Sequence, residues 1–170
     1  MNKKTLLTSF DIWLPHQKSN ASDDLLEEVG NLTCIANSLT FLRQLPVDVQ
    51  LASQQVIDKI NKFHPQNIIC CGMSEKRTKL SVESNATCGE KVLHTTVDLT
   101  ELVSDAKAIE ISHDCGKFVC EGVYYSVLDY LQRQQITSRC IFVHVPVLNE
   151  ENWAGIMADF LLIMQRLGNG

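Results

Sequence analysis

Short apolar runs alternate along the chain with longer segments in which apolar residues recur at helical spacing. The runs that predict strands cover residues 6–10, 39–45, 67–72, 80–87, 108–112 and 139–145. The segments that predict helices begin at Ser22 and cover 49–60, 98–106, 118–132 and 150–167. Strands alternating with helices are typical of a sheet covered by helices on both faces. The expected fold class is α/β, a three-layer α/β/α sandwich with a central mixed, mostly parallel sheet.

The same pattern contains no internal repeat, low-complexity tract or linker that would divide the chain. A length of 170 residues suits one domain, because a chain of this size buries about two-thirds of its unfolded surface. We therefore expect a single domain over residues 1–170. No apolar run approaches the roughly 18 residues of a membrane span, so the membrane is not an expected partner.

Charge and cysteine content indicate which classes of partner and which cell compartment the protein is expected to have. The net charge is −5, and Lys and Arg are scattered rather than clustered beside aromatic residues, which argues against nucleic acid as a partner. Seven cysteines without regular spacing predict reduced thiols. Lys3 and Lys4 precede a short apolar stretch, but Asp11 interrupts it before it is long enough to be the apolar core of a signal peptide. We expect a cytoplasmic protein that acts on a small or neutral substrate.

The helix that begins near Ser22 has acidic residues in its first two turns. We expect Ser22 to cap this helix, because serine is a favoured N-cap residue. Its acidic residues are Asp23, Asp24, Glu27 and Glu28. Their charge complements the helix dipole, and they are expected to form a solvated acidic face.

A cysteine and a histidine in the C-terminal third are the best candidates for chemistry. Asp114 or Gly116 could serve the start of the helix that follows, which would place Cys120 about one turn inside it. A helix N-terminus and a nearby imidazole both favour the thiolate form of cysteine. His144 ends the next strand and could act as the base. The alternatives are a small core cysteine and a hydrogen-bonded core histidine.

A third residue should orient the imidazole, and spacing alone leaves Glu83, Glu110 and Asp114 open for this role. Gly72 ends an apolar strand, and ligands of α/β sheets bind at such ends. The sequence lacks a C-x-x-C pair, an H-E-x-x-H helix and a glycine-rich phosphate loop. We therefore expect no metal site and no cofactor.

Five ordered blocks resemble a known family. They are 8–13, 45–47, 72–86, C-G-K-F-V-C-E at 115–121 and F-V-H-V-P at 142–146. The last two stand where the family has A-G-T-Y-V-C-N and F-I-H-I-P. On these blocks the sequence resembles pyroglutamyl peptidase I, the cytosolic cysteine peptidase of family C15 that removes an N-terminal pyroglutamate, over nearly its whole length.

The resemblance implies a role for each matching position. Cys120 would be the nucleophile, His144 the general base and Glu83 the carboxylate that orients the imidazole. Phe10 and Trp13 would form the walls that hold the flat lactam ring. Gly72 and Met73, at the end of their strand, would also contact the substrate.

The chain also departs from the family pattern. The segment from Glu83 to Cys120 is shorter than in the family, where it includes a loop that covers the pocket. Met73 replaces a glutamine, and Glu75 and Lys76 replace two glycines, whose conformational freedom allows close backbone approach. Glu121 replaces an asparagine, and its charge would raise the pKa of Cys120 if the side chain pointed inward.

The predicted function is removal of an N-terminal pyroglutamate from a small peptide substrate by attack of the Cys120 thiolate. Two alternatives stay open. One is a catalytically inactive binding module, which the shortened segment and lost glycines favour. The other is an amidase for a different small acyl group, which Met73 favours. A homo-oligomer is kept as a further partner hypothesis.

Overall fold

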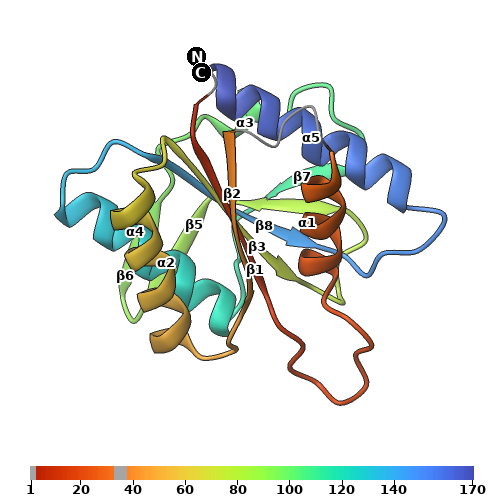
Figure 1. The fold of residues 1–170 in the computed structure, drawn as a ribbon, viewed down its shortest axis with the longest axis horizontal. Helices are drawn as coiled ribbons and strands as arrows, with labels where there is room; N and C mark the ends of the chain where they lie inside the picture. The colour runs from red at the N-terminus through yellow and green to blue at the C-terminus, as the bar shows by residue number, and fades with distance from the viewer. Residues whose placement is uncertain (1–2, 33–37) are drawn as a thin grey trace.

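A six-stranded mixed sheet forms the centre of the molecule (Figure 1), in a computed structural model that describes residues 3–32 and 38–170. Its strand order is β2-β1-β3-β8-β4-β7. Its strands are β1 (Thr5–Phe10), β2 (Leu39–Leu45), β3 (Asn67–Met73), β4 (Leu80–Glu83), β7 (Ile109–Ser112) and β8 (Arg139–Val145). The first four in spatial order are parallel, whereas β4 runs antiparallel to β8 and parallel to β7. The predicted mixed, mostly parallel sheet is confirmed.

Helices cover both faces of this sheet and complete the predicted three layers (Figure 1). One face carries α1 (Ala21–Asn31), the short α3 (Leu99–Leu102) and α5 (Trp153–Asn169), and the other carries α2 (Val49–Phe63) and α4 (Val119–Arg133). Each face has its own apolar core, with Phe160 at the centre of the first and Phe142 and Tyr124 in the second. The two cores follow from strands that are apolar on both sides.

The segment 80–87, predicted as one strand, forms two strands in different sheets. β4 ends at Glu83, and β5 (Asn85–Cys88) pairs with β6 (Lys91–His94) in a separate hairpin beside α4. Strand β6 was not predicted, since its residues are mostly exposed. The prediction was wrong because both strands alternate in the same way, and periodicity does not show where a chain leaves a sheet.

Two helix starts also differ from expectation. Asn20, not Ser22, is the N-cap of α1, and its side chain accepts a hydrogen bond from the Ser22 backbone N–H at 3.0 Å. Helix α4 begins at Val119 after the cap residue Phe118, which makes no side-chain cap hydrogen bond. Cys120 is therefore the second residue of α4 rather than a residue one turn inside it.

The expected solvated face of α1 is only partly solvated. Glu27 and Glu28 are exposed, but Asp23 is buried. Its carboxylate accepts hydrogen bonds from Ser9 Oγ at 2.6 Å and from Arg43 Nε and Nη2 at 2.8 and 2.9 Å. The side chain of Asp23 thus joins α1 to β1 and β2.

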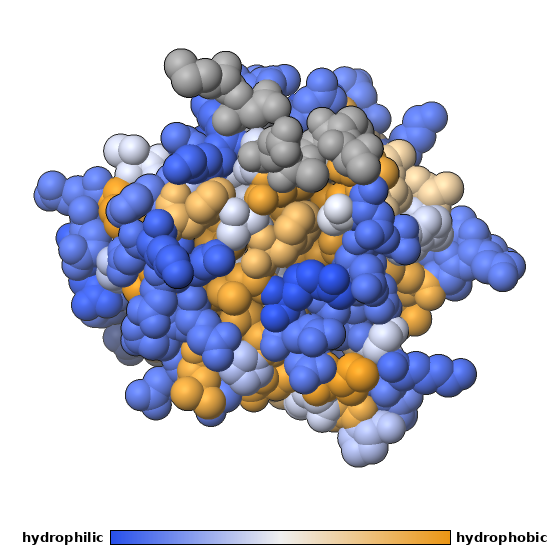
Figure 2. All heavy atoms as spheres, in the orientation of Figure 1, coloured by the Kyte–Doolittle hydropathy of each residue, from blue (hydrophilic) through white to orange (hydrophobic). Residues whose placement is uncertain are grey.

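Polar residues dominate the face seen in Figure 2, with an apolar band near its middle, over the edge strand β2. Half-buried Leu39, Phe41 and Leu42 come from this strand. Within the described residues, no helix combines the length and the apolar character needed to cross a bilayer.

Candidate active site

A cavity of about 1200 Å³ opens at the carboxyl ends of the parallel strands. Its walls come from the loop after β1, the loop after β3, the segment that joins β7 to α4, and His144 of β8. This is the edge at which ligands bind in open α/β sheets. Cys115, Cys120, Met73 and Trp13 also contribute to the lining.

A buried glutamate and histidine form a hydrogen-bonded pair beside this cavity. His144 Nδ1 lies 2.7 Å from Glu83 Oε1, and the two residues are 6% and 0% exposed. In the antiparallel β4–β8 pair, His144 lies opposite Ser81 and Glu83 lies opposite Phe142. Glu83 and His144 are therefore diagonal neighbours on one face of the sheet, a separation that long side chains can bridge. Of the three carboxylates left open by spacing, Glu83 contacts the imidazole.

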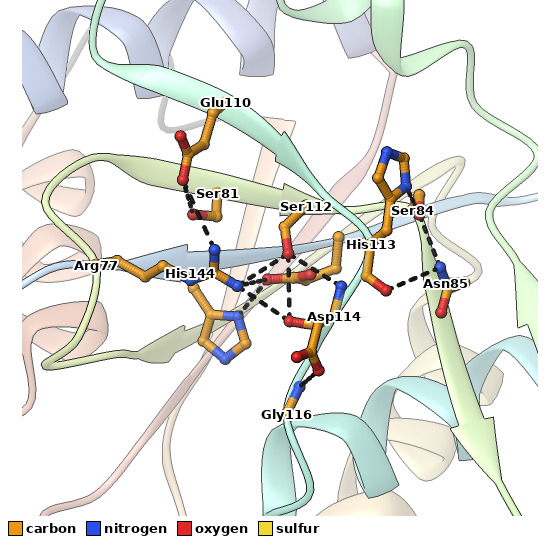
Figure 3. A network of polar contacts seen from close by, with 11 residues as sticks. Arg77, Ser81, Ser84, Asn85, Glu110, Ser112, His113, Asp114, Gly116 and His144 are labelled. Carbon is orange, nitrogen blue, oxygen red and sulfur yellow. Dashed lines mark hydrogen bonds and ion pairs between the residues drawn. The ribbon is translucent and has the colours of Figure 1, made fainter.

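Arg77 lies next to this pair and joins the β3–β4 loop to the end of β7 (Figure 3). Its guanidinium is 3.7 Å from Glu83 Oε1 and 3.7 Å from Glu110 Oε1. It also donates to Ser112 Oγ at 2.9 Å and to the Asp114 carbonyl at 3.0 Å. Sequence reasoning gave Arg77 no role, although it stands in a matching block. Its contacts show that it neutralises part of the buried negative charge.

Cys120 approaches the sheet through a gap left by a glycine. A β-carbon added at Gly72 would lie only 2.5 Å from Cys120 Sγ and 3.0 Å from the Phe142 ring. Gly72 is paired with His144 in the β3–β8 register, so the sulfur is seated beside the strand that carries the imidazole. The residue predicted to contact substrate is outside the cavity lining and instead makes room for Cys120.

The site keeps the Cys120 thiol protonated at neutral pH. Burial, followed by the negative charge of Glu83, raises the pKa of Cys120 to about 12, although a hydrogen bond from its own backbone N–H opposes this shift. The expected lowering of this pKa at the helix start is not found, because burial and the charge of Glu83 outweigh the hydrogen bond from the Cys120 backbone N–H.

Glu121 turns away from the thiol. Its Oε1 accepts hydrogen bonds from the backbone N–H of Thr87 at 3.0 Å and from the Thr87 hydroxyl. The charges that raise the pKa of Cys120 come from Glu83 and Cys70 and not from Glu121. Glu121 therefore links the β5–β6 hairpin to α4 and does not raise the pKa of Cys120.

A second cysteine lies closer to the buried pair than sequence reasoning indicated. Ligand atoms of Glu83, Cys115 and His144 all lie within 4.8 Å of one another. Cys115 is 5% exposed, and burial, together with the charge of Glu83, raises the pKa of its thiol well above the ordinary range. Spacing along the chain gave no signal for this group, because its members come from three separate elements.

The two predicted aromatic walls occupy different environments. Trp13 is 48% exposed and lines the cavity, where its ring contacts Phe118 with centroids 5.7 Å apart. Phe10 is 2% exposed, belongs to the core between the sheet, α2 and α4, and is absent from the cavity lining. Phe118, which is 70% exposed, was missed, since a helix-cap position gives no signal for ligand contact.

The positions that replace family glycines are accommodated without strain. Glu75 and Lys76 line the cavity, and neither has a positive φ. Glu75 Oε1 accepts from Gln17 Nε2 at 2.8 Å and lies 2.8 Å from His16 Nε2. These contacts join the loop after β1 to the loop after β3. Met73 also lines the cavity, where the Ala21 backbone N–H points at its sulfur at 3.3 Å.

The fold and the site are those of an α/β protein in which a buried histidine–carboxylate pair and two cysteines lie at one end of a mixed sheet. Known proteins match the chain in sequence and in fold. The pyroglutamyl peptidase family model matches residues 88–157. Pyrrolidone-carboxylate peptidase 2 of Caldanaerobacter subterraneus is 23% identical over 85% of this chain and 82% of its own length. The pyrrolidone-carboxylate peptidase of Vibrio parahaemolyticus is 25% identical over 88% of this chain and 81% of its own.

Solved structures agree with these sequence matches. Pyroglutamyl peptidase I from Bacillus amyloliquefaciens superposes with a TM-score of 0.85 at 19% identity and covers 100% of this chain and 97% of that chain. A mutant pyrrolidone carboxyl peptidase from Pyrococcus furiosus gives a TM-score of 0.81 at 16% identity, with 97% of each chain covered. The predicted resemblance to pyroglutamyl peptidase I is confirmed by these sequence matches and by the shared fold.

Proposed function

We propose that the protein is a cysteine peptidase that removes an N-terminal pyroglutamyl residue from peptides. The observation that carries this proposal is the buried His144 Nδ1–Glu83 Oε1 contact of 2.7 Å next to a cavity that Cys120 also lines. A carboxylate in this place fixes the tautomer and orientation of an imidazole that takes a proton from a nucleophile. The sequence relatives, which are pyrrolidone-carboxylate peptidases, support the same function.

The proposed reaction starts from a neutral thiol. His144 accepts the Cys120 proton as the sulfur attacks the carbonyl carbon of the pyroglutamyl group, so that imidazolium and tetrahedral intermediate form together. Free backbone N–H groups at the start of α4 stabilise the oxyanion. His144 then protonates the departing amine, and the acyl-enzyme is hydrolysed by a water molecule that His144 activates.

We assign substrate contact to Trp13 and Met73, which line the cavity. The exposed Trp13 ring offers a flat surface for a lactam, whereas buried Phe10 would support the site from below. Gly72 acts in this scheme by giving Cys120 its position. Phe118 extends the aromatic surface that Trp13 begins.

The test compares release of pyroglutamate from a chromogenic pyroglutamyl amide by the parent protein, Cys120→Ser and Cys88→Ser. Cys88 is an exposed cysteine of β5 and serves as the matched control. We expect Cys120→Ser to lose at least about 10³-fold in kcat, as removal of a catalytic nucleophile does, and Cys88→Ser to keep the parent rate. Equal rates for parent and Cys120→Ser would disprove the mechanism.

Met73, at a family glutamine position, gives specific support to an amidase for another small acyl group. A panel of prolyl, acetyl and glutamyl amides with the same leaving group separates the two activities. Faster release from one of these than from the pyroglutamyl amide, abolished by Cys120→Ser, would favour the second activity.

We further propose a cytoplasmic location, supported by an odd number of cysteines without disulfide-type spacing. Fractionation of source cells tests the location. A homo-oligomer is proposed from the family resemblance alone. Sedimentation equilibrium measures the number of subunits directly.

A further inference from the structure

A thiol, an imidazole and a carboxylate are gathered at the buried end of the site. Cys115 comes from the segment before α4, His144 from β8 and Glu83 from β4. All three residues are buried, and their ligand atoms lie within 4.8 Å of one another. Sulfur, nitrogen and oxygen ligands of these types are those that Zn²⁺ uses in proteins.

The distances suit a small ion with little rearrangement. Ligands at about 2.0–2.3 Å from a tetrahedral Zn²⁺ are about 3.3–3.8 Å from one another. A group already within 4.8 Å therefore needs shifts of under roughly 1 Å per side chain to reach this geometry. Cys115 and His144 also line the cavity, so an ion can reach them from solvent.

A second observation points to a ligand at this place. Glu83 is 0% exposed, and its Oε2 has no hydrogen-bond partner among the described residues, whereas Oε1 is used by His144. A buried carboxylate oxygen without a partner carries a desolvation penalty that a cation relieves.

We propose that Glu83, Cys115 and His144 bind one Zn²⁺ ion, or another thiophilic divalent cation, beside the cavity. Binding forms a metal–sulfur bond at Cys115 and breaks its S–H bond, and the proton passes to the solvent without any change of oxidation state. Arg77, 3.7 Å from Glu83 Oε1, repels the ion and keeps the affinity below that of a structural zinc site.

The site has a consequence for catalysis that rests on the proposed function. An ion on His144 occupies the imidazole that would accept the Cys120 proton. Metal binding and peptidase activity are therefore mutually exclusive, and Zn²⁺ acts as a reversible inhibitor.

The experiment titrates the metal-stripped full-length protein with Zn²⁺ by calorimetry and with Co²⁺ by absorption, which reports thiolate ligation directly. We expect one ion per chain and a thiolate-to-cobalt charge-transfer band. Removing a residue that only hydrogen-bonds to a metal ligand already lowers metal affinity by about 10–100-fold. Because Cys115 would be a direct ligand, Cys115→Ala should weaken Zn²⁺ binding by at least about 100-fold. The control Cys88→Ala should bind like the parent protein.

Cys120→Ala tests whether the ion is bound by Cys115, as proposed, or by Cys120 together with His144. We expect it to keep Zn²⁺ affinity within about threefold of the parent, since Cys120 is not a ligand. Loss of binding in Cys120→Ala with binding kept in Cys115→Ala would overturn the proposal, and so would absence of the cobalt band in the parent. If Cys115→Ala does not fold by circular dichroism, Cys115→Ser and Glu83→Gln take its place, and unchanged affinity in both overturns the proposal. These measurements need no peptidase activity, so their failure is distinct from failure of the proposed function.

Discussion

Two buried carboxylates, Asp23 and Glu83, are surrounded in very different ways. Asp23 accepts hydrogen bonds from Ser9, Arg43 and Gln44, so both of its oxygens are used. Glu83 has one hydrogen bond, from His144, and an arginine at 3.7 Å, and its second oxygen has no partner within the described residues. Both have an arginine nearby, yet only Asp23 is fully satisfied.

We interpret this difference as one between a carboxylate that stabilises the fold and one that serves the proposed reaction. A buried group with all its hydrogen bonds made stabilises one conformation, and losing it is costly. A buried group left incomplete costs stability in the folded state and persists where a reaction or ligand uses it. On this basis Asp23 should matter for unfolding and Glu83 for activity.

The largest expected effect is on activity, in Glu83→Gln. The amide keeps the shape of the side chain but no longer stabilises the imidazolium, so kcat should fall by about 10²–10⁴-fold. The free energy of unfolding should change by less than about 1 kcal/mol, within the range of neutral hydrogen-bond exchange. Steady-state kinetics and urea unfolding measure the two quantities on the same protein sample.

Although Glu83→Gln should lower kcat, it should make the Cys120 thiol more reactive toward alkylating reagents. The charge of Glu83 is one cause of the raised pKa of Cys120, so Glu83→Gln should alkylate Cys120 at lower pH than the parent does. An unchanged kcat combined with a large loss of stability would reverse the roles given to the two carboxylates.

The next largest effect is expected for stability, in Asp23→Ala. The change leaves Arg43 with only the exposed Glu27, 3.6 Å away, as a carboxylate partner and Ser9 Oγ without its 2.6 Å acceptor. Breaking such a pair should cost about 2–4 kcal/mol, somewhat less than for a fully buried pair because Arg43 is partly exposed. Thermal unfolding should show a Tm lower by about 5–15 °C, while kcat of the remaining folded protein stays at the parent value.

Acid should remove the contribution of Asp23 to the free energy of unfolding. Burial alone would raise the pKa of Asp23, but hydrogen bonds from Arg43, Ser9 and Gln44 outweigh it and lower the pKa below the ordinary 3.8. A carboxyl group whose pKa is lower in the folded protein than in the unfolded chain stabilises the fold at pH values above the unfolded-state pKa. This stabilisation is lost as the pH falls through the folded-state pKa. Unfolding free energy should therefore drop below about pH 4 in the parent. Asp23→Asn should show a flatter profile, and an identical slope in both would contradict this assignment.

The smallest effect is expected at Glu121, a carboxylate at the surface of α4. Its hydrogen bonds to Thr87 hold the β5–β6 hairpin, so Glu121→Ala should cost about 0.5–1.5 kcal/mol and loosen the hairpin. Hydrogen exchange of β5 amides measures the loosening. The pH profile of Cys120 alkylation should match the parent, and a shift toward lower pH would show that Glu121 acts on the thiol after all.

Sequence patterns predicted the layers of this fold well, because alternation and helical periodicity report on burial. They placed the strand that carries His144 at its observed bounds, Arg139–Val145. They failed where burial did not decide the outcome, as at the break after Glu83 and at the exposed strand β6. The span 118–132 predicted for α4 was correct to within one residue, but its start was wrongly assigned to Asp114 or Gly116, since the observed cap residue Phe118 makes no side-chain hydrogen bond that would mark it.

The site was predictable only in part. His144 was named from its place at the end of a strand, whereas Glu83 was selected among three carboxylates only by a matching block. Their contact follows from an antiparallel register that no local pattern reveals. The nearness of Cys115, the contacts of Arg77 and the burial of Phe10 depend on how separate elements pack. The protonation of Cys120 likewise depends on desolvation, which only the folded arrangement determines.

The space left by Gly72 couples the residues that are allowed at positions 72 and 120, although the two positions are far apart in the sequence. The volume of a single methyl group at residue 72 is already occupied by the sulfur at residue 120, so neither position can grow without the other shrinking. Substitutions at the two positions should consequently show strong epistasis. A lineage that gave up the thiol could replace this glycine once the Phe142 ring had also moved slightly, and one that kept the thiol could not.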